Sequence, residues 1–80
     1  MKNKPIIQNA AGQYLIDWSF RSQRREATAH FTAIRSMANR FTDEDQAIRV
    51  CRDLIRAGVG GPLYVRIEGE DGSRVTEVAS

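Results

Sequence analysis

Residues 42–58, TDEDQAIRVCRDLIRAG, constrain the fold more than any other stretch, because they carry a full set of signals for one amphipathic helix. Asp43 is followed three residues later by Gln46, which is the spacing of a capping box at a helix start. Acidic residues begin the segment, arginines lie toward its end as the helix dipole favours, and Gly58 marks the stop. The apolar positions share one face of the predicted helix: Ala47, Ile48, Val50, Cys51, Leu54 and Ile55.

The segment before residue 21 has the pattern of a β-hairpin. Ile6 and Ile7 are β-branched, and NAAG at 9–12 supplies turn residues. The residues that follow alternate in polarity, as in a half-buried strand. One face of this strand is apolar and the other is mostly polar: Tyr14, Ile16, Trp18 and Phe20 on the first, Leu15, Asp17 and Ser19 on the second.

A second hairpin is predicted over residues 60–80, where Leu63, Val65 and Ile67 alternate with Tyr64, Arg66 and Glu68 before the turn sequence EDGS. Val75 and Val78 fall on opposite faces of the last strand. This strand is therefore expected to be an edge strand or to carry a bulge.

Residues 22–41 fit two patterns. Helical spacing places five apolar residues on one stripe: Ala27, Phe31, Ile34, Ala38 and Phe41. Strand spacing separates two sets: Ala29, Phe31 and Ala33 from Thr28, His30, Thr32 and Ile34. Arg24 and Arg25 would oppose the dipole at a helix start, which favours RSQRRE as a hairpin loop. The longer stripe favours a helix from about Glu26, and this is our prediction, with the strand as the open alternative.

These segments together predict one α+β domain over residues 1–80. Its expected architecture is a small antiparallel sheet, built from the N- and C-terminal hairpins, with one or two α-helices packed on one face. A chain of 80 residues holds at most one domain, and its composition is that of an ordinary globular protein.

No residue pattern in the chain indicates catalysis or a cofactor. Cys51 lies on the apolar face of the predicted helix, so we expect a buried, unreactive thiol and no nucleophilic pair with His30. One Cys and one His cannot build a structural zinc site, and TDEDQ lacks the spacing of a calcium loop. GVGG at 58–61 follows a helix, whereas phosphate loops precede one. We therefore predict a protein that is not an enzyme and has no catalytic residue, metal site or cofactor.

Location follows from two further features. The apolar run that begins at Pro5 ends after Ile7, which is too short for a signal peptide or a membrane span. A lone cysteine fits a reducing compartment. The prediction is a cytoplasmic protein with no membrane contact.

Charge is distributed unevenly, with a net +5 over residues 1–42 and −3 over residues 43–80. Ten of the twelve basic residues are arginines, which make planar contacts with carboxylates and phosphates. Three of them lie in FRSQRREA at 20–27, and three recur on one side of the predicted helix. The predicted partner-binding residues are Arg21, Arg24, Arg25, Arg49, Arg52, Arg56, Tyr64 and Arg66.

A protein partner is the preferred interpretation, because separated basic and acidic regions suit electrostatically steered docking and Tyr and Arg are enriched in binding hot spots. That partner could itself be a nucleoprotein complex. Direct nucleic-acid binding is the alternative, since the arginines could contact phosphates and Tyr14, Trp18 and Tyr64 could stack on bases if they face outward. Trp18 is expected in the core, and Asp45 and Asp53 are expected to pair with Arg49, which weakens this alternative. The sequence leaves the partner's identity and the oligomeric state open.

The order of an aromatic strand YLIDWSF, a capped helix TDEDQAIRVCRDLIRAG and a final hairpin PLYVRIEGEDGSRVTEV resembles small phage-encoded inhibitors of the anti-CRISPR type. The resemblance is one of layout over residues 14–80. It implies a non-enzymatic inhibitor that docks on a bacterial defence (CRISPR-Cas) complex and blocks its nucleic-acid-binding surface. Many such inhibitors are strongly acidic, and this chain departs from them with its net charge of +2. They share no sequence signature, so the resemblance assigns no site residue here.

Overall fold

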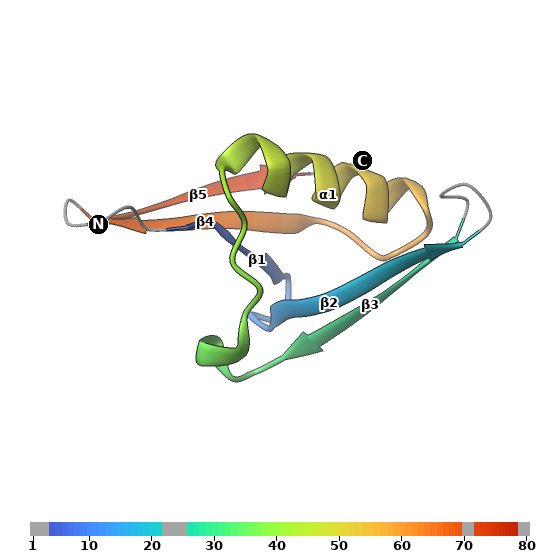
Figure 1. Ribbon diagram of the computed structural model, residues 1–80, viewed down its shortest axis with the longest axis horizontal. Coiled ribbons are helices and arrows are strands. Elements are labelled where there is room, and N and C mark those ends of the chain that lie inside the picture. The colour runs from blue at the N-terminus through green and yellow to red at the C-terminus, as the bar shows by residue number, and fades with distance from the viewer. Residues whose placement is uncertain (1–3, 22–25, 70–71, 79–80) are drawn as a thin grey trace.

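Five antiparallel strands form one sheet in the order β3-β2-β1-β4-β5, and one helix packs on one of its faces (Figure 1). The computed structural model describes residues 4–21, 26–69 and 72–78. The elements in chain order are β1 (Ile6–Asn9), β2 (Tyr14–Arg21), β3 (Glu26–Thr32), the short 3₁₀ turn η1 (Arg35–Met37), α1 (Glu44–Arg56), β4 (Leu63–Gly69) and β5 (Gly72–Val78). The predicted α+β class is confirmed, with one α-helix.

The first hairpin has the predicted turn. Asn9 Oδ1 accepts hydrogen bonds from the backbone N–H groups of Ala11 (3.0 Å) and Gln13 (2.9 Å). Gly12 adopts φ +82°, a left-handed conformation that glycine adopts without strain. Beyond this turn β1 and β2 diverge, because the only registered pair between them is Gln8 with Tyr14.

The C-terminal hairpin is paired along its whole length, from Leu63 with Val78 to Gly69 with Gly72. β5 is an edge strand, which is one of the two alternatives predicted for it. Its pairing with β4 shows no register shift, so the bulge alternative does not apply.

The helix predicted from about Glu26 is wrong, because residues 26–32 form strand β3, and between β3 and α1 only the three residues of η1 are helical. β3 pairs with β2 from Tyr14 with Thr32 to Arg21 with Glu26. The strand period turns Ala27, Ala29 and Phe31 toward the core. Pairing with β2 satisfies the backbone of this segment, and the strand alternative was therefore the correct one.

Leu15 also differs from its predicted face. We expected it beside Asp17 and Ser19, but it is fully buried in the core. The register between β2 and β3 shifts between Leu15 and Asp17, as in a β-bulge. This shift lets both Leu15 and Trp18 point toward the core, although they are three residues apart. Trp18 is part of the core as expected and stacks on Phe41, with ring centroids 5.2 Å apart.

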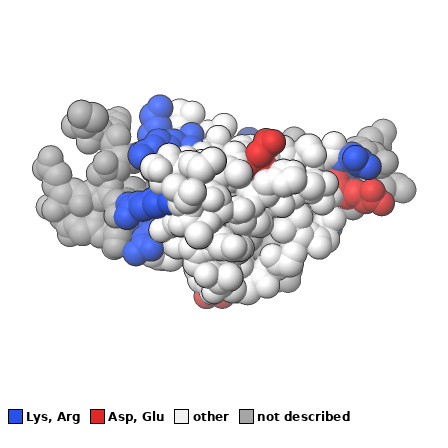
Figure 2. Space-filling view, turned by 90° about the horizontal axis from the view of Figure 1, so that it is seen from below, with Lys and Arg blue, Asp and Glu red and all other residues white. Residues whose placement is uncertain are grey.

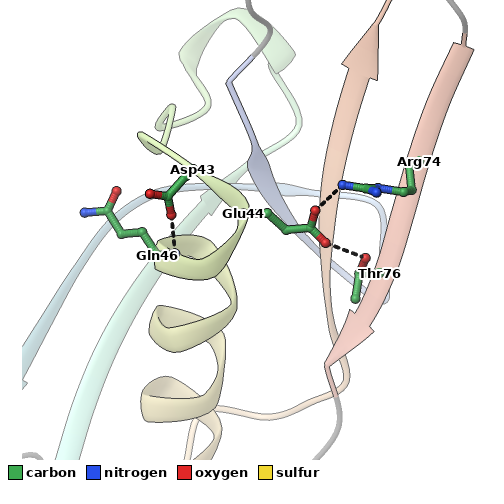
Figure 3. Close-up of polar contacts among 5 residues, drawn as sticks. All are labelled: Asp43, Glu44, Gln46, Arg74 and Thr76. Carbon is green, nitrogen blue, oxygen red and sulfur yellow. Dashed lines mark hydrogen bonds and ion pairs between the residues drawn. The ribbon is translucent and has the colours of Figure 1, made fainter.

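α1 has the predicted start and stop. Asp43 Oδ1 accepts a hydrogen bond from the Gln46 backbone N–H at 2.8 Å (Figure 3). At the other end Gly58 adopts φ +97°, the Gly58 N–H donates to Ile55 O, and the Val59 N–H donates to Leu54 O, which together form a Schellman motif.

The buried side of α1 covers the sheet mainly over β4, and the core lies between them. Its fully or almost fully buried members are Ile7, Leu15, Phe41, Ala47, Cys51, Leu54, Leu63, Val65 and Val78. Glu44 also ties the first turn of α1 to β5, since its carboxylate pairs with Arg74 and accepts a hydrogen bond from Thr76 Oγ1 at 3.3 Å (Figure 3).

The chain between η1 and α1 links the two diverging parts of the sheet (Figure 1). The Asn39 N–H donates to Leu15 O on β2, and the Phe41 N–H donates to Pro5 O just before β1, both at 2.9 Å. Residues 38–41 therefore connect the β2–β3 hairpin to the β1 side of the sheet.

Candidate binding surfaces

The predicted basic loop is described only at its edge. Arg21 is exposed at the end of β2 and is registered opposite Glu26 on β3. Arg24 and Arg25 lie outside the described residues. The hairpin placement of RSQRRE agrees with the positions of β2 and β3 on either side of it.

The three helix arginines lie together, as predicted. Arg49, Arg52 and Arg56 are exposed on the solvent side of α1 and line a shallow depression with Asp45 and Asp53. The expected pairing of Arg49 with Asp45 and Asp53 stays a prediction. The mixed signs along this depression leave it only weakly basic, so it presents no strong field to an anionic partner.

Tyr64 and Arg66 lie on the face of the sheet opposite α1. On β4 the buried residues Leu63 and Val65 point to the core, so Tyr64 and Arg66 point the other way. Arg66 is half-buried, and its Nη1 donates a hydrogen bond to Gln8 Oε1 at 3.1 Å. The Arg66 Nε is enclosed and has no hydrogen-bond partner among the described residues.

A second tyrosine shares this face. Gln8 on β1 is registered with Tyr14 on one side and with Tyr64 on the other, so the three side chains form one row across β2, β1 and β4. Both tyrosines are half-buried, and neither belongs to the core cluster. We name this row, together with Arg66, the tyrosine row. The outward position of Tyr14 and Tyr64 was the condition set for base stacking.

Two basic residues that the sequence did not indicate lie at the edge of this face. Lys4 is two residues before Ile6, which is registered opposite Arg66. The hydrogen bond between the Phe41 N–H and Pro5 O brings the backbone next to the exposed Arg40 beside the start of β1. Figure 2, which views the molecule from below, shows basic atoms gathered toward the end where the N-terminus lies. Lys4, Arg40 and Arg66 form what we call the basic corner.

Exposed apolar side chains mark another surface. Ile34 is 55% exposed and Met37 is 54% exposed, and they lie at the beginning and end of the η1 turn. Hydrogen bonds fix this turn: Ile34 N–H to Thr32 Oγ1, Met37 N–H to Ile34 O, and Ala38 N–H to Arg35 O. We call Ile34 and Met37 the η1 knob. Two apolar residues near a short polar turn give no periodic pattern, so sequence reasoning missed this surface.

Cys51 and His30, the two residues considered for catalysis, lie in different surroundings. Cys51 has no exposed surface, and burial raises the pKa of its thiol to about 12. His30 is exposed on β3 and points away from the core, toward which its neighbours Ala29 and Phe31 turn. Within residues 4–21, 26–69 and 72–78, no three His, Cys, Asp or Glu side chains come together in a way that could hold a metal ion.

Comparisons with protein-family models, with curated proteins and with solved structures give no match for this chain. In the part of the chain that the structure describes, no helix has the length and apolar character needed to cross a bilayer.

Proposed function

We propose that this chain is a small, non-enzymatic protein-binding module that docks on its partner through the η1 knob. The observation that carries the proposal is the pair Ile34 and Met37, each more than half exposed on a turn fixed by hydrogen bonds. Single exposed apolar residues are common on protein surfaces. Two large ones side by side on one fixed turn form a patch of the kind that partners cover.

Fixing the turn matters for the binding free energy. A mobile apolar loop loses conformational entropy when a partner orders it, whereas a turn that is already held loses little. Burial of both side chains removes apolar area from water, worth about 25 cal/mol per Å² before the costs of association. Apolar side chains of this kind favour a protein as the partner. A nucleic-acid backbone presents charged phosphates, which do not bury apolar groups.

The sharpest form of the proposal is an inhibitor that docks on a bacterial defence complex and blocks its nucleic-acid-binding surface. Its support is the resemblance to anti-CRISPR proteins, together with a small antiparallel sheet and one helix in a chain of 80 residues. The predicted arginines Arg21, Arg49, Arg52 and Arg56 are all exposed, so they remain candidates for steering such docking.

The test is quantitative capture of proteins from a nuclease-treated bacterial lysate by the tagged chain and by the double variant Ile34→Ser/Met37→Ser. We expect the double variant to lose at least tenfold of the specifically retained protein, because both anchors are gone. A photo-crosslinking residue at position 37 should attach to that same protein, whereas one at position 52 should not.

Val75→Ser is the matched control, because Val75 is an equally exposed apolar side chain on another element, β5. Its capture should equal that of the unmodified chain. Both variants should melt within a few degrees of it, since the altered side chains are more than or about half exposed. Equal capture by Ile34→Ser/Met37→Ser would show that the η1 knob is not the docking surface.

A further inference from the structure

We propose that the face of the sheet opposite α1 binds single-stranded nucleic acid, with Tyr14 and Tyr64 stacking on bases and the basic corner contacting phosphates. This inference goes beyond the proposed protein-binding function and does not depend on it, because it uses different residues and a different surface.

The tyrosine row has the geometry of a stacking platform. Gln8 separates the two tyrosines across three neighbouring strands. Neighbouring strands lie about 4.8 Å apart, so the backbones that carry the two rings are about 10 Å apart. A ring on each side of β1 therefore takes a separate base, because a single base held between two rings would need them closer together. Every base has a π-face, so such a platform tolerates any sequence.

Among the described residues the one α-helix packs on the other face, so no helix covers the row. An antiparallel sheet with one solvated face ordinarily carries polar residues there. Here this face carries two half-buried aromatic rings, and Ile6 on the same side of β1 is buried. Trp18, the third aromatic considered for stacking, is in the core against Phe41 and takes no part.

The basic corner lies beside the row on the same face. Ile6 is registered opposite Arg66, and Tyr64 precedes Arg66 by two residues on β4, so the guanidinium lies next to one ring. Lys4 and Arg40 are exposed near the start of β1. Glu77 is registered opposite Tyr64 on the other side of β4, so a carboxylate also borders this ring. The basic residues gather where β1 begins, and a phosphate backbone would run along that side of the row.

Arg66 is held in a position to contact an anion. Its Nη1 bonds Gln8 Oε1, and its Nε is enclosed without a partner. A charged donor makes stronger hydrogen bonds to an anionic oxygen than a neutral one does, so the terminal nitrogens of Arg66 are the groups that would contact a phosphate. The hydrogen bond to Gln8 also fixes the side chain, so little rotamer entropy is lost on binding.

Single-stranded nucleic acid fits this combination better than an acidic protein or a duplex. An acidic peptide would satisfy the basic corner but would leave two flat rings without a role. In a duplex the bases are already stacked on one another and cannot reach the rings. Only an unpaired strand supplies bases and phosphates at once.

The first test uses the unmodified chain. ¹H–¹⁵N spectra are recorded while a 12-nucleotide oligothymidylate is added, with poly-L-glutamate and a 12-base-pair duplex as comparison probes. We expect shifts at Gln8, Tyr14 and Tyr64 with the single strand, and weaker or no shifts there with the other two probes. Equal shifts with poly-L-glutamate would mean that charge alone is recognised, and shifts confined to α1 would place binding on the helix arginines; either result overturns the proposal.

The second test measures affinity by fluorescence anisotropy of the labelled oligothymidylate. Tyr64→Ala should weaken binding roughly 5- to 150-fold, the range for loss of one stacked base, while Tyr64→Phe keeps the ring and should retain most of the affinity. With about three phosphate contacts, affinity should fall about 20-fold between 50 and 200 mM salt, and Arg40→Glu should reduce that dependence.

Arg52→Glu is the matched charge control, because it makes the same change of charge on the opposite side of the molecule and should have a much smaller effect than Arg40→Glu. Equal losses for the two would contradict a defined basic corner. The Ile34→Ser/Met37→Ser variant should bind the oligonucleotide normally, so failure of this proposal and failure of the η1 knob give different results. No binding of the oligothymidylate by the unmodified, folded chain would overturn the proposal outright.

Discussion

Cys51 lies in the middle of the buried side of α1, and its side chain has no exposed surface. Cys51→Ser places a hydroxyl in this apolar surrounding, and we expect it to lower the free energy of unfolding by about 1–3 kcal/mol. Cys51→Ala leaves no polar group behind and should cost less. Urea unfolding followed by circular dichroism measures both. Native stability in the serine variant, or an equal loss in both variants, would contradict the buried position.

The same residue predicts a dependence on pH. Burial raises the pKa of the Cys51 thiol from its ordinary 9.0 to about 12. Above pH 9 the unfolded chain therefore loses a proton that the folded chain keeps, so stability is complete below pH 9 and falls as the pH rises toward 12. Between pH 8 and pH 10 this group alone should remove about 1.4 kcal/mol.

Other groups also titrate between pH 8 and pH 10. The contribution of the thiol is therefore measured as the difference between two proteins, one with Cys51 and one without it. The free energy of unfolding is determined at pH 8 and pH 10 for the unmodified chain and for Cys51→Ala, which lacks the thiol. The unmodified chain should lose more by the stated amount. Equal losses would mean that the thiol ionises in the folded chain as readily as in the unfolded one.

At the scale of elements, the start of α1 depends on one side chain. Asp43 Oδ1 accepts the Gln46 N–H, and Gln46 Oε1 in turn accepts the Thr42 N–H at 2.9 Å. Asp43→Ala should lower the free energy of unfolding by about 1 kcal/mol. Asp43→Asn keeps the cap and removes the charge, so it should cost only a few tenths. If Asn is as destabilising as Ala in thermal unfolding, the dipole rather than the cap is responsible.

Local signals explain why α1 and the turn at residues 9–12 were predictable. Asp43, Gln46 and Gly58 act on backbone groups within a few residues of themselves, so the sequence alone determines their effect. The ion pair of Glu44 with Arg74 joins residues far apart in the sequence, and no pattern predicts it. That pair is largely exposed on the Arg74 side and adds little stability.

Local sequence patterns did not predict β3. Phe31 is on the helical stripe and also on the inward side of a strand, so both patterns accept it. The strand forms because β2 lies beside this segment and pairs with its backbone from Tyr14 to Arg21. The bulge at Leu15 has the same origin, since it adjusts β2 to β3. A sequence shows which residues could pair but not the partner that makes one pairing better than a local helix.

The candidate surfaces belong to the scale of the whole molecule. Tyr64 and Arg66 were predicted as single residues, but the tyrosine row exists only because β1 lies between β2 and β4. The basic corner joins Lys4, Arg40 and Arg66, which are far apart in the sequence. Charge runs such as RSQRRE and the helix arginines attract attention in a sequence, whereas a surface assembled from separate elements leaves no local trace.

The attachment of the β2–β3 hairpin is also a property of the whole molecule, and it depends on Phe41. β1 and β2 share one registered pair, and Phe41 adds a further connection, because its ring stacks on Trp18 while its N–H bonds Pro5 O. Phe41→Ala should cost about 3–5 kcal/mol, which approaches the whole stability of a domain this small. We expect it to be mostly unfolded by circular dichroism.

Phe41→Leu keeps most of the volume and loses the ring, so it should remain folded and reveal the order of opening. Trp18 emission reports the docking of the hairpin, whereas far-ultraviolet dichroism reports the structure as a whole. In the unmodified chain both signals should change at the same urea concentration. In Phe41→Leu the Trp18 signal should change first, because the hairpin has lost the ring that stacks on Trp18. Coincident transitions in the variant, with the midpoint of the unmodified chain, would mean that the single β1–β2 pair and the remaining core contacts are enough to hold the hairpin in place.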